Sequence, residues 1–231
     1  MTNTYLITGA NRGIGLEMAR RVIANGDILH AICRNPSASN ELTTLLDNSN
    51  GRIQIHSADT CDSSSLDKIA NQIKGNIDIL VCNAGVMSAR GGIDDIQNDL
   101  DSVSDTLVTN VAGPFFTTRA FLKNLKNSQN PRIAIISSFM GSQQHEGSNA
   151  YFYRASKAGA NNIMVTLSNE LRSDGITVAA FHPGWVRTDM GGSGADLSPN
   201  ESASALITQF NNLSLSKTGK FLNYDGKSLP L

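Results

Sequence analysis

The chain has 231 residues, of which 19 are basic and 20 are acidic, giving a formal net charge of −1. This balance excludes a bulk electrostatic attraction to nucleic acid or to an anionic membrane, although a local pocket could still take a phosphorylated small molecule. The length suits one α/β domain over residues 1–231, which can bury a sizeable core without disulfides or metals.

The start of the chain and its cysteines bear on where the protein works. The opening MTNTYLITGA lacks a basic segment followed by a long apolar core, and no later run approaches the length of a membrane span. We therefore expect a cytoplasmic protein with no nucleic-acid or membrane partner. Cys33, Cys61 and Cys82 are odd in number and show no CxxC spacing, so we expect reduced thiols. The four histidines lack ligand spacing, and no metal is expected.

Strand-like and helix-like segments alternate along the chain. Short runs rich in β-branched residues predict strands at 5–8, 27–33, 52–57, 77–83, 132–137, 176–182 and 220–224. Stretches of helical length fall between them at 13–25, 63–74, 100–125, 154–173 and 201–213. Because several runs are apolar on both faces, the pattern predicts a Rossmann-type, doubly wound parallel sheet of about seven strands with helices on both faces. Ligands of such a sheet bind beyond the carboxyl ends of the strands.

The first expected strand runs into TGANRGIG, with glycines at 9, 13 and 15 before a helix. Glycine lets backbone amides approach a pyrophosphate closely, and the helix N-terminus supplies oriented N–H groups and the positive end of the helix dipole. The spacing differs from the GxGxxG fingerprint, and tight turns also recruit glycine. In the first β-α turn of an α/β chain, however, the motif favours a bound dinucleotide.

The end of the second expected strand bears on which dinucleotide is bound. An acidic residue there would hydrogen-bond the ribose hydroxyls of NAD(H), but this chain has Cys33 followed by Arg34. Asp27 begins the strand, several residues too early to reach the ribose. Arg34 and Arg12 could converge on a 2′-phosphate, since arginine pairs with phosphate in a bidentate geometry. We predict NADP(H) over NAD(H); the alternative is that both arginines are solvated loop residues.

The segment YFYRASK, at 151–157, holds two tyrosines and a lysine. At 100° per residue, Tyr153 and Lys157 are about 400° apart and share one helix face, whereas Tyr151 points elsewhere. A neighbouring ammonium favours the phenolate, so Tyr153 could exchange a proton with a carbonyl or alcohol oxygen near neutral pH. On its own, such a pair is more often a simple contact on a helix surface.

Six motifs occur in one order along the chain: TGANRGIG, NAG at 83–85, NVAG at 110–113, SS at 137–138, YRASK, and PGWVRT at 183–188. Their order and spacing resemble the short-chain dehydrogenase/reductase family. The stretches YRASKA, PGWVRTDMGG and GKFLNYDG are most similar to its C-factor and sniffer-like carbonyl reductase branch. The resemblance covers essentially the whole chain. It implies an NADP(H)-dependent oxidoreductase that interconverts a carbonyl and an alcohol by hydride transfer.

The resemblance also assigns roles to the residues that match its motifs. It implies that Tyr153 is the general acid/base, that Lys157 binds the nicotinamide ribose and lowers the pKa of Tyr153, and that Ser138 hydrogen-bonds the substrate oxygen. Asn110 would hold a water that links Lys157 to solvent. Besides Tyr153 and Lys157, the implied cofactor-binding residues are Thr8, Gly9, Asn11, Arg12, Gly13, Ile14, Gly15, Arg34, Asp59, Asn83, Ala84, Gly85, Pro183, Val186 and Thr188.

The role of Asn110 can be weighed physically. Pro114 lies four residues later and has no N–H, so in a continuous helix the Asn110 carbonyl would lose its usual partner and be available to water. The alternative is a proline kink that only shapes the helix.

The resemblance assigns the serine, because Ser138 matches the second serine of the family's SSxxG pattern, which reads SSFMG in this chain. Ser138 precedes Tyr153 by a longer interval than the family commonly shows, and we assign the difference to two extra residues in the loop QQHEGSN, at 143–149, because loops absorb insertions. Strand alternation would put Ser137 and Ser138 on opposite faces, so that only one faces the substrate. We favour Ser138.

The leading hypothesis is an NADPH-dependent carbonyl reductase, and the alternative is a dinucleotide-binding signalling or regulatory protein with little turnover. The loop at 143–149 and a flap from Met190 to about Pro199 should border the substrate, but neither carries a charged cluster that names it. The short segment after the sixth expected strand favours an open site with broad carbonyl specificity. A homodimer or homotetramer could form through the helices expected at 100–125 and 154–173.

Overall fold

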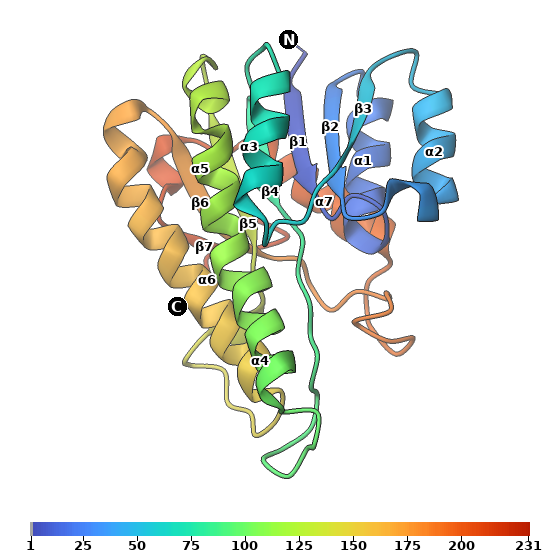
Figure 1. Ribbon diagram of the computed structural model, residues 1–231. Helices are drawn as coiled ribbons and strands as arrows, with labels where there is room; N and C mark the ends of the chain where they lie inside the picture. The colour runs from blue at the N-terminus through green and yellow to red at the C-terminus, as the bar shows by residue number, and fades with distance from the viewer. Residues whose placement is uncertain (1) are drawn as a thin grey trace.

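The computed structural model describes residues 2–231, and within them seven strands form one sheet (Figure 1). The strands are β1 (Thr4–Thr8), β2 (Ile28–Cys33), β3 (Ile53–Ser57), β4 (Ile79–Cys82), β5 (Arg132–Ile136), β6 (Thr177–His182) and β7 (Phe221–Asn223). Their order is β3-β2-β1-β4-β5-β6-β7, and every neighbouring pair is parallel. The predicted Rossmann-type, doubly wound architecture is confirmed.

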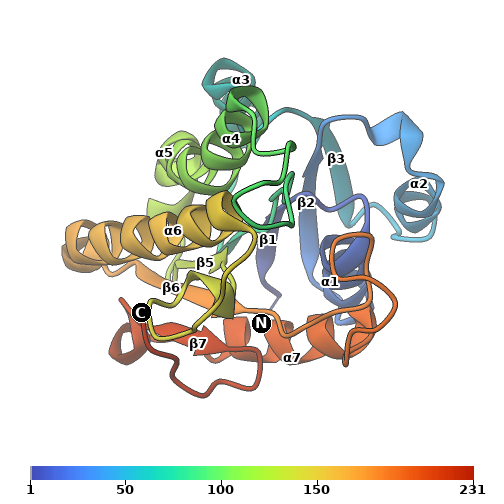
Figure 2. The ribbon, with the colours of Figure 1, turned by 90° about the horizontal axis from the view of Figure 1, so that it is seen from below.

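Helices cover both faces of the sheet, as the view from below in Figure 2 shows. One face carries α1 (Gly13–Ala24), α2 (Asn40–Asp47) and α7 (Pro199–Asn211), and the other carries α3 (Ser63–Gln72), α5 (Gly113–Lys126) and α6 (Tyr151–Glu170). Met18 and Phe210 are fully buried in the first core, and Phe121 and Met164 in the second. The central strands β4 and β5 are buried along their whole length, as expected of parallel strands between two helical layers.

Most predicted elements agree with the structure to within a few residues, but α2 was not predicted. This helix spans eight residues, buries Leu42, and begins at Ser39, whose Oγ accepts the Leu42 N–H at 3.4 Å. Its apolar residues Leu42, Leu45 and Leu46 follow helical spacing, but eight residues are fewer than the roughly 10 to 12 at which length separates a helix from other short segments.

The helix predicted at 100–125 is interrupted by a wider turn. α4 (Leu100–Leu107) is followed by a π-helical turn, η2 (Val108–Ala112), after which α5 continues. Pro114 cannot offer an N–H to the Asn110 carbonyl, so the helical hydrogen-bond ladder is broken beside Asn110. The proline is thus associated with a π turn rather than with an uninterrupted helix.

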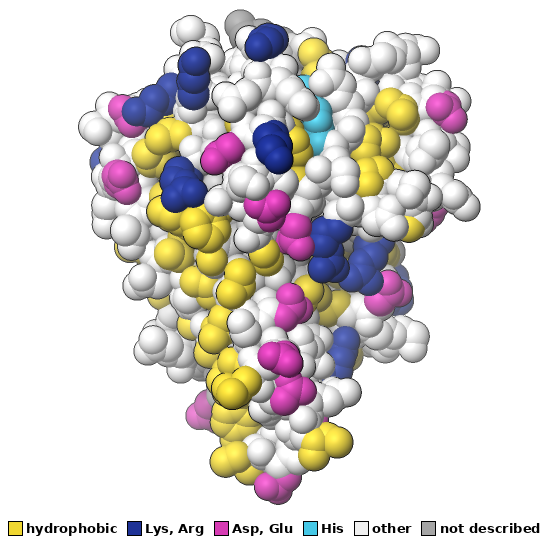
Figure 3. Space-filling view, viewed as in Figure 1, with side chains coloured by type: hydrophobic (Ala, Val, Ile, Leu, Met, Phe, Trp, Pro, Cys, Tyr) yellow, Lys and Arg dark blue, Asp and Glu magenta, His cyan; other side chains and the backbone are white. Residues whose placement is uncertain are grey.

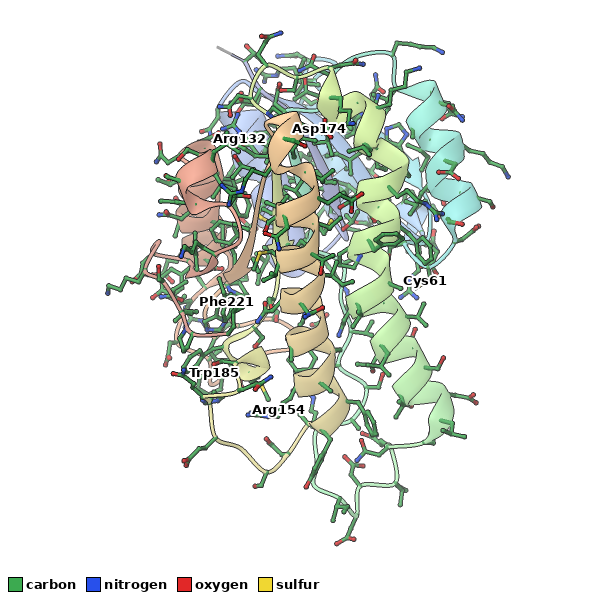
Figure 4. The ribbon with its side chains drawn as sticks, turned by 90° about the vertical axis from the view of Figure 1, so that its left-hand side faces the viewer. Cys61, Arg132, Arg154, Asp174, Trp185 and Phe221 are labelled. Carbon is green, nitrogen blue, oxygen red and sulfur yellow. The ribbon has the colours of Figure 1, made fainter. Side chains whose placement is uncertain are left out.

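The carboxyl ends of the strands lie at one edge of the sheet, which faces the viewer in Figure 2. β1 lies between β2 and β4, so the strand order reverses there, and α/β sheets bind ligands at such a switch point. Arg132, at the start of β5, lies at the opposite edge, far from Trp185 and Arg154 in Figure 4. The loops after β1, β4, β5 and β6 therefore build the candidate site.

Candidate active site

The loop after β1, residues 8–15, is called the glycine loop here, and glycine sets its shape. Gly9 and Gly13 have φ values of +66° and +55°, which other residues rarely adopt. A Cβ on Gly15 would lie 2.1 Å from the Gly9 carbonyl oxygen and 2.6 Å from Asn83 Nδ2, so no larger residue fits there. The tight turn leaves its backbone open to close approach by a ligand.

The N-terminus of α1 differs from those of most other helices. α2, α3, α4 and α7 each begin at a side chain that caps backbone N–H groups. Within the described chain, α1 begins at Arg12 with no capping side chain and no acidic residue in its first turn. Its free N–H groups and the positive end of its dipole suit an anion. Together with the glycine loop, they fit the pyrophosphate of a dinucleotide.

Thr8 and Asn83 join the glycine loop to the end of β4. Thr8 Oγ1 accepts the N–H groups of Asn83 and Ala84 at 3.0 and 3.1 Å. Asn83 Nδ2 donates to the carbonyls of Thr8 and Gly9 at 2.9 and 3.2 Å. Predicted residues that are far apart in sequence are therefore in contact, and the Asn83 side chain positions the glycine loop.

The remaining members of the glycine loop contact other parts of the fold. The Asn11 carbonyl accepts the Ser39 hydroxyl at 2.9 Å, and Ile14 is half-buried against the core. A Cβ on Gly13 would lie 3.3 Å from Thr188 Cγ2, so this loop is next to the segment after β6. In that segment, the predicted cofactor residues Pro183, Val186 and Thr188 are half-buried or buried.

Three predicted residues lie near the end of the glycine loop and the ends of β2 and β3, where the adenosine is expected. Arg34 is exposed, and among residues 2–231 its guanidinium makes no ion pair. Arg12 is also exposed but pairs with Asp189, with its Nη1 3.0 Å from Oδ2. Asp59 Oδ1 accepts the Cys61 N–H at 2.9 Å. The two arginines expected at a 2′-phosphate thus differ, because one of them is already paired.

Tyr153 and Lys157 lie one turn apart on α6, and both are buried. The Lys157 ammonium is 5.5 Å from the centre of the Tyr153 ring. Ser138 lies close enough to Tyr153 to lower the pKa of its phenol. Tyr151, at the start of the helix, is 46% exposed. The structure therefore groups Tyr153, rather than Tyr151, with the lysine and the serine.

Burial drives the tyrosine and the lysine toward their uncharged forms. Desolvation raises the pKa of Tyr153 to about 12, against smaller lowering effects of Ser138 and Arg90. Desolvation also lowers the pKa of Lys157 to about 8. In the protein's own groups, burial thus outweighs the lowering influences on the Tyr153 pKa, and the expected lowering by Lys157 stays a prediction. Lys157 Nζ donates to the Ile136 carbonyl at 2.9 Å.

Asn110 braces two segments of the site with its side chain. Its Oδ1 accepts the Val86 N–H at 2.9 Å, and its Nδ2 donates to the Val86 carbonyl at 2.8 Å and to Ser156 Oγ at 2.9 Å. Ser156 in turn donates to the Tyr153 carbonyl at 2.7 Å. Both amide protons of Asn110 are used. Pro114 takes away the helical N–H partner of the Asn110 backbone carbonyl, and we expect the water at that carbonyl.

Two glycines let neighbouring segments approach Lys157. A Cβ on Gly85 would lie 3.1 Å from Asn110 Oδ1 and 3.4 Å from Lys157 Nζ. A Cβ on Gly141 would lie 2.6 Å from the Lys157 backbone carbonyl carbon, so the turn after Ser138 packs directly on α6. The glycines of the NAG and SSFMG motifs therefore allow the close packing of the site.

The two serines do not follow the expected alternation of strand faces. β5 ends at Ile136, so Ser137 and Ser138 both lie beyond the strand. Ser137 donates to the Lys157 carbonyl at 3.1 Å, while Ser138 caps the following 3₁₀ turn and lies beside Tyr153. Both serines thus reach α6, which corrects the expectation, and Ser138 is the one next to the phenol.

The segment 143–149 forms an irregular loop between Ser138 and α6. The His145 ring stacks on Phe139 with a centroid distance of 4.6 Å, and Arg154 of α6 donates to the His145 carbonyl. Figure 4 shows Arg154 and Trp185 toward the same end of the molecule. This loop can accommodate extra residues between Ser138 and α6 without changing the helical spacing of Tyr153 and Lys157.

Motif reasoning missed two charged residues of this site. Asp189 pairs with Arg12, and its carbonyl lies 3.5 Å from Arg90 Nη2. Arg90 also helps to lower the pKa of Tyr153. The available signal was weak: Asp189 directly follows the PGWVRT motif, and Arg90 stands five residues after the NAG motif.

The described residues lack two further features. In residues 2–231, no three or more His, Cys, Asp or Glu side chains are grouped so that they could hold a metal ion. Over the same range, none of the helices combines the length and the apolar character needed to cross a membrane.

Comparison with known proteins agrees with this geometry. The pattern of the short chain dehydrogenase family matches residues 3–196. An uncharacterized oxidoreductase of Schizosaccharomyces pombe is 30% identical over 98% of this chain and 97% of the relative. C-signal of Myxococcus xanthus is 34% identical over 69% of this chain and 96% of the relative.

Solved structures extend the likeness to the whole chain. The carbonyl reductase Sniffer of D. melanogaster has a TM-score of 0.94 and 31% identity, covering 100% of both chains. The NADPH-bound carbonyl reductase from chicken fatty liver has a TM-score of 0.92 and 31% identity, covering 100% of this chain and 99% of that one. The chain therefore belongs to the short-chain dehydrogenase family of oxidoreductases, and it resembles the branch that holds C-signal and sniffer-type proteins.

Proposed function

We propose that the protein is an NADPH-dependent carbonyl reductase, which interconverts a carbonyl and an alcohol. The observation that carries the proposal is the buried group of Tyr153, Lys157 and Ser138, at the same sheet edge as the glycine loop. The likeness to the carbonyl reductases of D. melanogaster and chicken supports the same activity.

Each residue of the group has a role that its surroundings favour. When bound, NADPH supplies the hydride for the carbonyl carbon. Tyr153 holds the proton that the oxygen then needs, because burial raises its pKa to about 12, and Ser138 orients that oxygen. Lys157 uses one N–H on Ile136 and has two more that suit ribose hydroxyls. Asn110 fixes the loop after β4 against α6 and offers its carbonyl to a water.

The decisive experiment replaces the proton donor. Tyr153→Phe should lower the reduction rate by about 10²- to 10⁴-fold, because a positioned acid is lost, while NADPH still binds. Tyr151→Phe is the matched control and should stay near the wild-type rate. NADPH oxidation would be followed against a panel of aldehydes, ketones and quinones. Unchanged turnover in Tyr153→Phe, with a compound that the wild type reduces well, would refute the assignment.

A second function is favoured by the 34% identity with C-signal. Under this alternative, the protein binds a dinucleotide and acts as a signalling or regulatory protein with little turnover. Binding of NADPH without reduction of any compound in the panel would favour it over the reductase.

The preference for NADP(H) is supported by Arg34 and Arg12 and by the lack of an acidic residue at the end of β2. Arg34→Asp should reduce kcat/KM with NADPH far more than with NADH, because a carboxylate repels the 2′-phosphate and suits ribose hydroxyls. Equal losses with both cofactors would remove Arg34 as a phosphate ligand.

Self-association and location also belong to this proposal. Figure 3 shows apolar side chains running over α4, α5 and α6. Leu107 of α4, Val108 of the π turn and Phe115 of α5 are exposed. These residues support a homodimer or homotetramer through the long helices. We also propose that the protein acts in the cytoplasm, and that it takes a broad range of small carbonyl compounds because the segment after β6 is short. Sedimentation of the wild type and of Phe115→Glu tests the assembly, which the charge should weaken if this face is buried.

A further inference from the structure

Three loops of the site meet at Asp189. Its carboxylate Oδ2 lies 3.0 Å from Arg12 Nη1 of the glycine loop, and its carbonyl lies 3.5 Å from Arg90 Nη2 of the loop after β4. Asp189 itself follows Thr188 and precedes the flap, residues 190–199. The ion pair with Arg12 therefore ties the base of the flap to the glycine loop.

The same guanidinium has a second use under the proposed function. Arg12 and Arg34 are the two arginines that would receive the 2′-phosphate of NADP(H). Arg34 makes no ion pair among the described residues, whereas Arg12 already holds a carboxylate. The phosphate must therefore share or displace the partner that Arg12 has in this structure.

We propose that Asp189 competes with the 2′-phosphate for Arg12 and so lowers the preference of the protein for NADP(H) over NAD(H). The inference rests on the proposed use of NADP(H). A phosphate monoester carries nearly two negative charges and accepts a bidentate pair from arginine, so it displaces the carboxylate. The side chains of Arg12 and Asp189 are 64% and 83% exposed, which makes their pair weak. The competition should weaken NADP(H) binding by about two- to fivefold.

The first test is binding, measured by titration calorimetry with NADPH and NADH. Asp189→Asn keeps the shape of the side chain and removes its charge. It should tighten NADPH binding by about two- to fivefold and leave NADH binding unchanged, and the gain should shrink at high salt. Asp196→Asn, an exposed acid in the same flap, is the control and should change neither affinity. An unchanged ratio of the two affinities in Asp189→Asn, or an equal change in both, would overturn the proposal.

The Arg12→Gln background separates competition from simple repulsion. Once Arg12 is gone, Asp189→Asn should bring no further gain in NADPH affinity. A gain that persists would mean that Asp189 repels the phosphate directly, and the competition would be refuted. If Arg12→Gln alone leaves NADPH affinity unchanged, Arg12 does not bind the 2′-phosphate, and both the proposed contact and the inference about Asp189 are refuted. If Arg12→Gln weakens NADPH but Asp189→Asn alters nothing, only the inference about Asp189 fails.

The sole tryptophan gives a second readout, independent of the affinities. Trp185 donates its indole N–H to the Gly191 carbonyl in the flap at 2.9 Å and is 54% exposed. Adenosine 2′,5′-bisphosphate carries the 2′-phosphate but no nicotinamide. 5′-AMP lacks both the 2′-phosphate and the nicotinamide. The bisphosphate should change Trp185 emission in the wild type, because the ion pair at the base of the flap opens, and AMP should not. Saturation with the bisphosphate at unchanged emission would show that the ion pair stays closed and would overturn the competition.

Discussion

The buried lysine of the site should weaken the folded state, and Lys157→Met should therefore stabilise the protein. Lys157 is 5% exposed, and its Nζ has a neutral partner, the Ile136 carbonyl. Its pKa is about 8 in the folded chain, against an ordinary value of 10.5. Folding must therefore bring a charged ammonium into a poorly solvating place at neutral pH.

The size of the effect follows from linkage. The two pKa values differ by about 2.5, and each unit corresponds to ~1.4 kcal/mol, so the charge costs ~3 kcal/mol at neutral pH. The variant leaves the Ile136 carbonyl without its donor, which offsets ~1 kcal/mol. The net gain for Lys157→Met is thus ~2 kcal/mol near pH 7. Between about pH 8 and pH 10.5 the unfolded chain binds more protons, so wild-type stability rises with pH and the gain disappears.

Urea unfolding followed by circular dichroism would measure this difference. We expect Lys157→Met to exceed the wild type by ~2 kcal/mol near pH 7 and to match it to within ~0.5 kcal/mol near pH 9.5. Lys123→Met, on the exposed side of α5, is the matched control and should shift stability by less than ~0.5 kcal/mol at either pH. A variant that is less stable than the wild type by the same amount at both pH values would refute the reasoning, since Lys157 would then contribute mainly by packing.

Three further changes test other parts of the structure. Gly15→Ala should abolish dinucleotide binding in calorimetry, because its Cβ would lie 2.1 Å from the Gly9 carbonyl oxygen; retained affinity would contradict the tight turn. Arg132→Met should lower the free energy of unfolding by ~3 kcal/mol, since this buried guanidinium donates to the α7 carbonyls of Phe210 and Asn211; a loss below ~1 kcal/mol would count against that role. Arg90→Gln should move the pH profile of alcohol oxidation to higher pH, because Arg90 lowers the pKa of Tyr153, and an unmoved profile would exclude this effect.

The fold was accessible from sequence because its dominant signals are local. Strands that are apolar on both faces and alternate with helices allow few arrangements other than a doubly wound parallel sheet. α2 was missed because it has only eight residues, too few for helical spacing to distinguish it from a loop or a short strand. The π turn at 108–112 was missed for a different reason. Pro114 predicts that one helical hydrogen bond at Asn110 is missing. Both a kink and a π turn can accommodate that loss, and the sequence does not distinguish between them.

The site residues could be predicted from the sequence where their motifs directly follow strands, because parallel strands bring their carboxyl ends to one edge of the sheet. The ion pair between Arg12 and Asp189 joins residues 177 positions apart, and no periodicity reports such a contact. The direction in which the Tyr153 pKa shifts could not be predicted from the sequence either, because the sequence shows the neighbouring Lys157 but not the burial of the phenol. Burial is a property of the packed chain, and here it outweighs the neighbour.

The pairing of Lys157 with a backbone carbonyl connects stability with chemistry. A carboxylate in place of the Ile136 carbonyl would hold the ammonium strongly and remove its stability penalty, but it would also occupy the donors that suit a ribose. A neutral acceptor leaves two of the three N–H groups free, at the cost of an unfavourable buried charge. The same desolvation keeps Tyr153 protonated, in the form that can donate to a carbonyl oxygen. The instability expected of Lys157 and the protonated state of Tyr153 therefore have one cause, which is the desolvation of both side chains by the packing of α6 against the turn after β5.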